Sequence, residues 1–210
     1  MNKIILLVIT IYSFHFTLCF AEDSVLLNDL PPLPKETYLF RSEEQFGYRG
    51  KIGGFMLPPS RVGVYFDKTV YYETKEADHQ SMKVMYKKVD KKSFCGAYVI
   101  FLADISNYKT MTFLIKGQRG GETFEVGIND VISNKREDAV YVGAINRYLP
   151  GGVTKGWQLV KVPLSDFFGP DLSKVYSLVF HFNDIGEGVF WIDEIRFCKE
   201  DLISQERIAE

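Results

Sequence analysis

The chain contains few of the residues that catalytic and metal sites usually need. Its 210 residues include three cysteines and three histidines, which form neither a C-x-x-C pair nor a zinc-binding spacing. The sequence also carries no P-loop and no dinucleotide-binding glycine motif. Its 25 basic and 27 acidic residues nearly cancel, leaving a formal charge of −2, so no strong field attracts nucleic acid. These absences argue against an enzyme, a zinc protein and a nucleic-acid-binding protein.

Aromatic residues, in contrast, are abundant. Phe, Tyr and Trp together make up 15% of the chain, with 17 Phe and 12 Tyr. Flat rings fit the pleated surface of a sheet, so this composition favours β structure. The hydrophobic share of 46% is ordinary for a globular domain, and it excludes a disordered chain, a collagen and a coiled coil.

The long apolar run of the sequence stands at its N-terminus. Lys3 precedes the run Ile4–Phe16, and the small residue Ala21 follows it, which is typical of a secretory signal peptide cleaved after Ala21. The run is shorter than the roughly 20 residues that a membrane-spanning helix needs. We therefore expect residues 1–21 to be removed and the protein to be secreted, extracellular or periplasmic, with no membrane contact after cleavage. A lipoprotein anchored through Cys19 is the alternative.

Prolines divide the rest of the chain. Five of the eight prolines lie between residues 22 and 61, and the stretch Leu30–Pro34 should run as extended polyproline. We therefore expect a Pro-rich arm over residues 22–61, one compact domain over residues 62–198, and a C-terminal tail over residues 199–210.

Within the predicted domain, apolar and polar residues alternate with a period of two. Such alternation predicts strands with one buried face, and the Gly-rich segments between them predict turns. Short strands at this spacing indicate an all-β fold, a β-sandwich of the jelly-roll type. The alternating segments are residues 82–87, 111–116, 124–129, 160–164, 178–183 and 189–198.

The last of these strands contains an irregularity. Phe190 and Ile192 share one parity, while Ile195 and Phe197 share the other. A β-bulge at Asp193–Glu194 would return both pairs to the core. A carboxylate at such a bulge could join backbone carbonyls around a calcium ion, and a solvated acidic turn is the alternative.

Two cysteines remain after the predicted leader, Cys95 and Cys198. In an oxidising compartment the two could form a disulfide. The alternative is a pair of buried thiols.

Several blocks of sequence resemble, in order and spacing, the galactose-binding-like β-sandwich domains, and more narrowly the family 11 type of carbohydrate-binding module of secreted bacterial proteins. The blocks are Ala103–Tyr108, Met111–Gly117, Gly120–Glu125, Gly156–Phe167, Asp171–Ser173 and Val189–Phe197. The resemblance implies a jelly roll that binds a polysaccharide or glycan on its concave sheet or rim loops. It also implies a structural calcium, with Asp193 as the ligand from the last strand and Asp67 as a ligand from the early segment.

The same sandwich also resembles the complex I intermediate-associated family, which shares the Trp, Pro-Leu and final Asp-x-Ile elements. This second resemblance implies an alternative function, in which an assembly or surface protein uses the same sandwich to bind a protein partner. A small glycan-active enzyme is a third hypothesis, but the sequence shows no flanking signature for paired carboxylates or for a histidine-based triad. We therefore expect a protein without catalytic activity.

Polysaccharide binding needs exposed rings and planar polar groups. Alternation places Tyr98, Glu125, Asn129, His181 and Asn183 on the sheet face opposite the core. The predicted loop over residues 137–154 adds Tyr141, Arg147 and Tyr148. For each of them, ordinary surface or core packing is the alternative. Of the two tryptophans, we expect Trp157 to be structural and Trp191 to be more exposed.

The calcium hypothesis predicts a change in thermal stability. A chelator should lower the melting temperature and added calcium should restore it, because an ion that binds only the folded chain stabilises it. Calorimetry on the purified domain measures both shifts. A melting temperature that responds to neither addition would leave Asp193 as part of an acidic turn.

Overall fold

The computed structural model describes residues 37–38, 51–70, 80–132 and 139–199. The predicted signal peptide, the Leu30–Pro34 stretch and nearly all of the predicted C-terminal tail lie outside these residues. The leader, its cleavage and the course of the arm therefore stay predictions.

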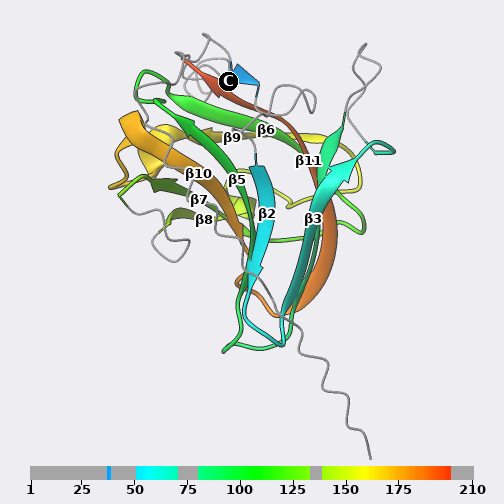
Figure 1. The fold of residues 1–210 in the computed structure, drawn as a ribbon. Coiled ribbons are helices and arrows are strands. Elements are labelled where there is room, and N and C mark those ends of the chain that lie inside the picture. The colour runs from blue at the N-terminus through cyan, green and yellow to red at the C-terminus, as the bar shows by residue number, and fades with distance from the viewer. Residues whose placement is uncertain (1–36, 39–50, 71–79, 133–138, 200–210) are drawn as a thin grey trace, which may run out of the picture.

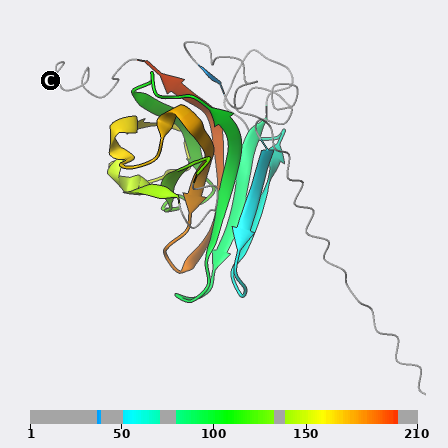
Figure 2. The same ribbon diagram turned by 60° about the vertical axis from the view of Figure 1, so that its left-hand side comes forward.

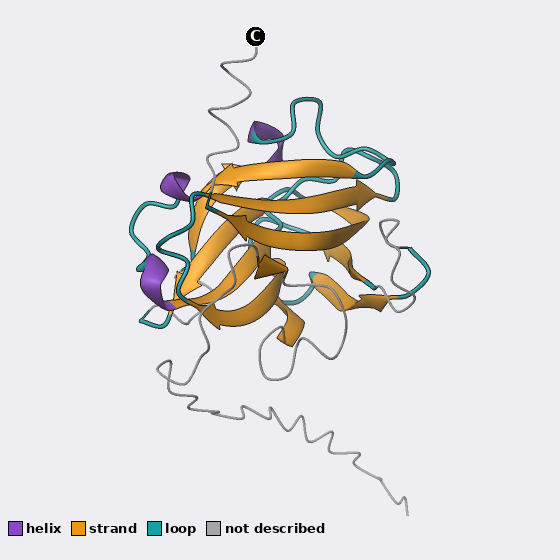
Figure 3. Ribbon diagram, turned by 90° about the horizontal axis from the view of Figure 1, so that it is seen from above, coloured by secondary structure: helices purple, strands orange, loops and turns teal. Residues whose placement is uncertain are grey.

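Two antiparallel sheets face each other (Figures 1 and 3). The larger sheet has the order β3 (Arg61–Asp67), β4 (Ser81–Lys88), β11 (Gly186–Cys198), β6 (Thr110–Gly117) and β9 (Gln158–Pro163), and β1 (Thr37–Tyr38) also pairs with β11. The smaller sheet has the order β2 (Lys51–Met56), β5 (Cys95–Ala103), β10 (Val175–His181), β7 (Glu125–Asp130) and β8 (Val140–Ala144). The predicted all-β sandwich is confirmed.

Short 3-10 helices complete the described structure, and they lie at the periphery of the strands (Figure 3). They are η4 (Ile145–Arg147), η5 (Leu164–Asp166) and η6 (Leu172–Lys174). Within the described ranges, no helix has the length and apolar character to cross a membrane.

Aromatic rings join the two sheets in the core. Phe124 stacks on Phe190 of β11 with ring centroids 4.8 Å apart, and meets Phe180 of β10 edge-on at 5.6 Å. All three rings are buried. Because consecutive strand residues point to opposite faces, each buried ring turns its chain neighbours outward.

The predicted bulge in the last strand is also confirmed. The register between β11 and β6 shifts between Asp193 and Arg196, and Glu194 has a φ of 50°. The extra residue restores the inward parity of the strand, so that Ile195 and Phe197 are fully buried.

The sandwich begins earlier in the chain than the sequence suggests. β2 falls inside residues 22–61, the expected arm, and pairs with β5 from Lys51 opposite Ile100 to Met56 opposite Cys95. Figures 1 and 2 show β2 at the edge of its sheet. Two adjacent glycines, Gly53 and Gly54, interrupt the alternation there, which hides the strand from a pattern search.

The two cysteines lie at opposite ends of the sandwich and are not joined to each other. Cys198 follows Phe197, whose ring lies 5.4 Å from that of Phe101 near the end of β5. Cys95 begins β5, about 20 Å from Phe101 at the usual rise of an extended strand. A disulfide needs Cα atoms within about 7 Å, so the possible bridge between Cys95 and Cys198 does not form. Burial raises the pKa of the Cys95 thiol, which fits the alternative of a buried thiol.

Candidate functional site

The outer face of the smaller sheet carries most of the predicted binding residues. In the register of the strands, His181 of β10 lies opposite Gly96 of β5 and Glu125 of β7. Val179 lies opposite Tyr98 and Gly127 in the same way. These residues point away from the core, because their neighbours Leu178, Phe180 and Phe182 are fully buried in it.

Three rings form a row across this face, which we call the ring row: Phe55 of β2, His181 of β10 and Tyr141 of β8. The rings of Phe55 and His181 are nearly parallel, at 12°, with centroids 6.2 Å apart. The rings of His181 and Tyr141 are 5.4 Å apart at 37°. The rings come from the first, third and fifth strands of the sheet, but those of Phe55 and Tyr141 lean inward over the strands between, so the outer two centroids are at most about 12 Å apart.

Glycines underlie the ring row. A Cβ on Gly96 would stand 2.3 Å from the Phe55 ring, and one on Gly127 would stand 2.6 Å from the Tyr141 ring. The same holds for Gly53, where a Cβ would lie 2.5 Å from the Tyr98 hydroxyl oxygen. The rings therefore lie directly on bare backbone, an arrangement in which an aromatic side chain covers a glycine of the neighbouring strand.

The titratable groups of the row are held neutral. Burial lowers the pKa of His181, and this effect, together with repulsion from Lys88, outweighs the opposing attraction of Glu125. Burial and the Glu125 charge raise the pKa of Tyr141 to about 12. At neutral pH the face thus offers a neutral imidazole, a protonated phenol and one carboxylate, which together donate and accept hydrogen bonds.

Three other predicted residues lie on or near this face. Tyr98 is half-buried on the same side of the sheet, and Asn129 lies two residues beyond Gly127 and is only 1% exposed. Asn183 is exposed in the turn after β10. The structure therefore gathers Tyr98, Glu125, Tyr141 and His181 most closely, and adds Phe55, which the pattern of alternation did not reveal.

Arg147 and Tyr148 belong to a different cluster. The Tyr148 hydroxyl donates to Asp166 at 2.6 Å, and the Arg147 guanidinium lies 3.2 Å from the same carboxylate. Arg147 also donates to the Val142 carbonyl oxygen at 3.3 Å. These contacts fasten η4 to η5. Residues 137–154 were expected to form a loop, but the described part of that segment contains β8 and η4.

Both carboxylate oxygens of Asp67 accept hydrogen bonds from neighbouring side chains or backbone. Its Oδ1 accepts hydrogen bonds from the Thr69 amide at 2.8 Å and the Thr69 hydroxyl at 2.6 Å. Its Oδ2 accepts from the Trp191 indole at 2.9 Å and lies 3.6 Å from the Lys83 ammonium. The expectation that Trp191 is exposed was wrong: it is only 6% exposed, because Asp67 holds its edge and Lys83 lies 5.1 Å above its ring.

Asp193 lies apart from Asp67. β4 separates their strands, so two inter-strand spacings, about 10 Å, stand between them. Asp193 is fully buried, and its Oδ1 accepts from the Glu194 amide at 2.8 Å. Across the described residues no group of three or more His, Cys, Asp or Glu side chains could hold a metal ion. Calcium at Asp67 and Asp193 stays a prediction.

Comparison with known proteins identifies the family of this chain. The family model described as carbohydrate binding domain 30 matches residues 36–199. No curated protein matches the chain. Among solved structures, the chain is similar to the family 30 carbohydrate-binding module of the cellulosomal cellulase Cel9D-Cel44B of Clostridium thermocellum, with 22% identity, coverage of 79% of this chain and 98% of that one, and a TM-score of 0.62.

Two further solved structures are family 11 modules of the same organism. The chain is 16% identical to the module of the cellulosomal cellulase Lic26A-Cel5E, covering 80% of this chain and 96% of that one, with a TM-score of 0.56. It is also 16% identical to a family 11 module in complex with a β-1,3-1,4-mixed-linked tetrasaccharide, covering 70% and 88%, with a TM-score of 0.54. At these identities the likeness concerns the fold.

The contacts of Asp67 predict a pH-dependent contribution to stability. Burial alone would raise the pKa of this carboxyl, but the hydrogen bonds from Thr69 and Trp191 and the Lys83 charge lower it from 3.8 to about 2. A depressed folded-state pKa stabilises the fold above the unfolded pKa, and that stability is lost as the pH falls through the folded value. We expect Asp67→Asn to lower the melting temperature by about 3 °C at pH 7.

The difference between wild type and Asp67→Asn should narrow as the pH falls from 4 towards 2, which circular dichroism melts can follow. Asp104→Asn is the matched control, since Asp104 accepts the same pair of bonds from Ser106 without a tryptophan partner. Equal losses in both variants, or a difference that does not change with pH, would contradict a special role for Asp67.

Proposed function

The chain belongs to the carbohydrate binding domain 30 family, and from this membership we propose that its ring row binds a linear β-glucan without cleaving it. The protein is a carbohydrate-binding module. The observation that carries the proposed site is the row itself, in which Phe55, His181 and Tyr141 lie side by side across one sheet. The solved family 11 module in complex with a mixed-linked tetrasaccharide supports a β-glucan as the class of ligand.

Rings that lie flat on a sheet suit sugar recognition. The C–H groups of a pyranose pack on an aromatic face, while polar groups beside the ring bind the hydroxyls. Three neighbouring rings can meet successive residues of a sugar chain, which a single sugar cannot do. Because Gly96 and Gly127 let the rings rest on the backbone, the rings lose little side-chain freedom on binding.

The neutral state of the row favours an uncharged ligand. His181 keeps an unprotonated imidazole and Tyr141 keeps its proton at neutral pH, so each ring edge can both donate and accept. Glu125 adds a carboxylate beside His181. A shallow, wet and hydrogen-bonded site of this kind should bind with a Kd of roughly 10⁻³ to 10⁻⁵ M.

Binding without hydrolysis agrees with the number of carboxylates on the outer face of the smaller sheet. A glycosidase places two carboxylates on either side of the scissile bond. Among the outward-facing positions that the structure describes on the smaller sheet, Glu125 is the single acid. Incubation with soluble mixed-linked β-glucan should therefore release no reducing ends.

We also propose that the protein acts outside the cytoplasm, as its apolar N-terminal run suggests. Mass spectrometry of the protein exported by an expressing bacterium should find a mature chain that begins at Glu22. A retained leader, or a lipid on Cys19, would contradict this.

Replacement of the ring row should weaken glucan binding specifically. We expect Tyr141→Ala and His181→Ala each to raise the Kd for soluble mixed-linked β-glucan about tenfold, because each loses one stacking surface. Phe168→Ala is the matched control, since Phe168 is 91% exposed and stands outside the row. Affinity electrophoresis measures the Kd of all three variants. Melting curves show whether each variant folds.

Equal weakening by Phe168→Ala, or unchanged binding by both ring variants, would place the glucan elsewhere. If the wild type bound no member of a broad glycan array, the hypothesis of a protein partner would replace this proposal.

A further inference from the structure

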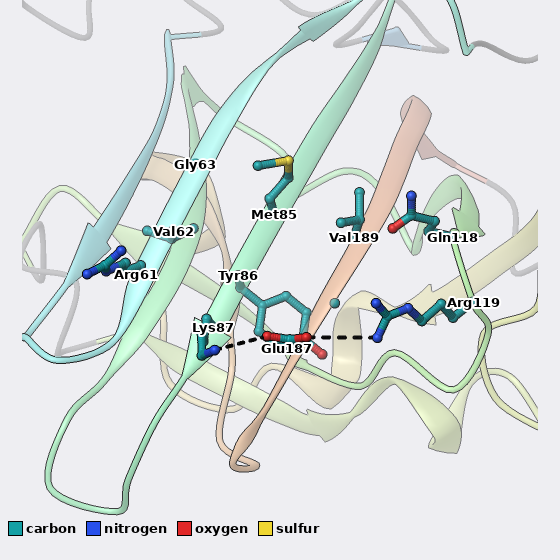
Figure 4. Close-up of a pocket in the computed structure, with 11 residues that line it drawn as sticks. Arg61, Val62, Gly63, Met85, Tyr86, Lys87, Gln118, Arg119, Glu187 and Val189 are labelled. Atoms are coloured by element: carbon teal, nitrogen blue, oxygen red, sulfur yellow. Dashed lines mark ion pairs between the residues drawn. The ribbon is translucent and has the colours of Figure 1, made fainter.

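Whereas the ring row lies on the outer face of the smaller sheet, a hollow lies on the outer face of the larger sheet (Figure 4). Its volume is about 430 Å³. Gly63 of β3, Met85 of β4 and Val189 of β11 are aligned in the strand register and make an apolar floor. They face outward, because Val84 and Phe190, their neighbours in sequence, are fully buried in the core.

Charged side chains border this floor. Arg61, Lys87 and Glu187 stand opposite one another on the same three strands, and Arg119 approaches from the segment between β6 and β7 (Figure 4). The Lys87 ammonium lies 3.2 Å and the Arg119 guanidinium 3.9 Å from the Glu187 carboxylate. Among the described residues, no carboxylate pairs with Arg61.

The hollow carries a net positive charge, whereas the whole chain carries a net negative charge. Three cations surround one carboxylate at this site, although the whole chain has a formal charge of −2. Because Lys87, Arg119 and Glu187 all have more than half of their side-chain surface exposed, their ion pairs hold the cations in place only weakly. An anionic ligand can therefore displace Glu187 from them at little cost.

We propose that this hollow binds an acidic polysaccharide, a polyuronate, through its carboxylate groups. The planar guanidinium groups of Arg61 and Arg119 each match a carboxylate in a two-bonded geometry. They stand on either side of Glu187, so that carboxylates repeated along one chain can reach both. The apolar floor meets the C–H faces of the sugars, and the Gln118 amide at the rim can bind their hydroxyls.

Gly63 leaves the floor open. A Cβ on Gly63 would meet only the Tyr65 ring, at an ordinary contact distance of 3.6 Å, and its backbone is not in the left-handed region. Gly63→Leu should therefore fold and fill the hollow while every charge stays in place. This variant separates recognition of the sugar from simple attraction between charges.

The test uses four probes with the full mature chain: polygalacturonate, its methyl ester, polyglutamate and neutral mixed-linked β-glucan. We expect polygalacturonate in the gel to retard the wild-type protein in affinity electrophoresis. This retardation should fall as the salt concentration rises. The methyl ester, which has the same backbone without the charge, should not bind at the hollow. Polyglutamate should bind more weakly, because it lacks the pyranose faces.

The variants should change the affinity for polygalacturonate in opposite directions. The double variant Arg61→Ala/Arg119→Ala should weaken polygalacturonate binding at least about tenfold, and Gly63→Leu should weaken it comparably. Glu187→Gln should strengthen it severalfold, because it removes the competing carboxylate. None of these changes should alter binding of the neutral glucan, and Tyr141→Ala should leave polygalacturonate binding intact.

Four results would overturn the proposal: no polygalacturonate binding at low salt, equal binding of the methyl ester, equal binding of polyglutamate, or no effect of the charge and Gly63 variants. Since the ring row and the hollow lie on different sheets and are probed with different polymers, failure of one proposal leaves the other standing.

Discussion

The ring row depends on two places in the sheet where a side chain would not fit. Gly96 and Gly127 lie beneath the rings of Phe55 and Tyr141, and a Cβ at either site would stand within 2.6 Å of ring atoms. Bare backbone lets both rings settle against the sheet on either side of His181, which projects from the central strand. The buried rings of Phe180 and Phe182 fix the direction of His181, since neighbouring residues in a strand face opposite ways. The core of the sandwich thus determines what its outer face presents.

The two outer faces of the sandwich differ in chemistry because different residues occupy equivalent outward positions. On the smaller sheet, the outward residues of the ring row are rings that cover glycines, and burial keeps the titratable rings neutral. On the larger sheet, the outward residues near the hollow are cations around one carboxylate. Farther along the same sheet, Asp67, Lys83 and Trp191 neutralise and cover one another. A single fold in this way holds an aromatic surface on one sheet and a cationic one on the other.

Local alternation predicted much of this from sequence alone. It indicated the sandwich, the outward direction of Tyr98, Glu125 and His181, and the bulge at Asp193–Glu194, because each depends only on residues close in sequence. It failed where contacts between distant segments decide the outcome. Phe55 was hidden in a glycine-interrupted strand, Tyr148 is held by Asp166, and Trp191 is covered through Asp67. No pattern in a single segment shows these partners.

The central claim is that the outer face of the smaller sheet is the surface that meets a glucan chain, and backbone amide NMR tests it most directly. During titration with a β-1,3-1,4-linked tetrasaccharide, the amide signals of Gly53, Gly96 and Gly127 should move together and saturate in the millimolar range or below. The signals of Gly63 and Gly188, on the larger sheet, should stay in place. Shifts confined to the larger sheet, or no shifts at all, would contradict the account.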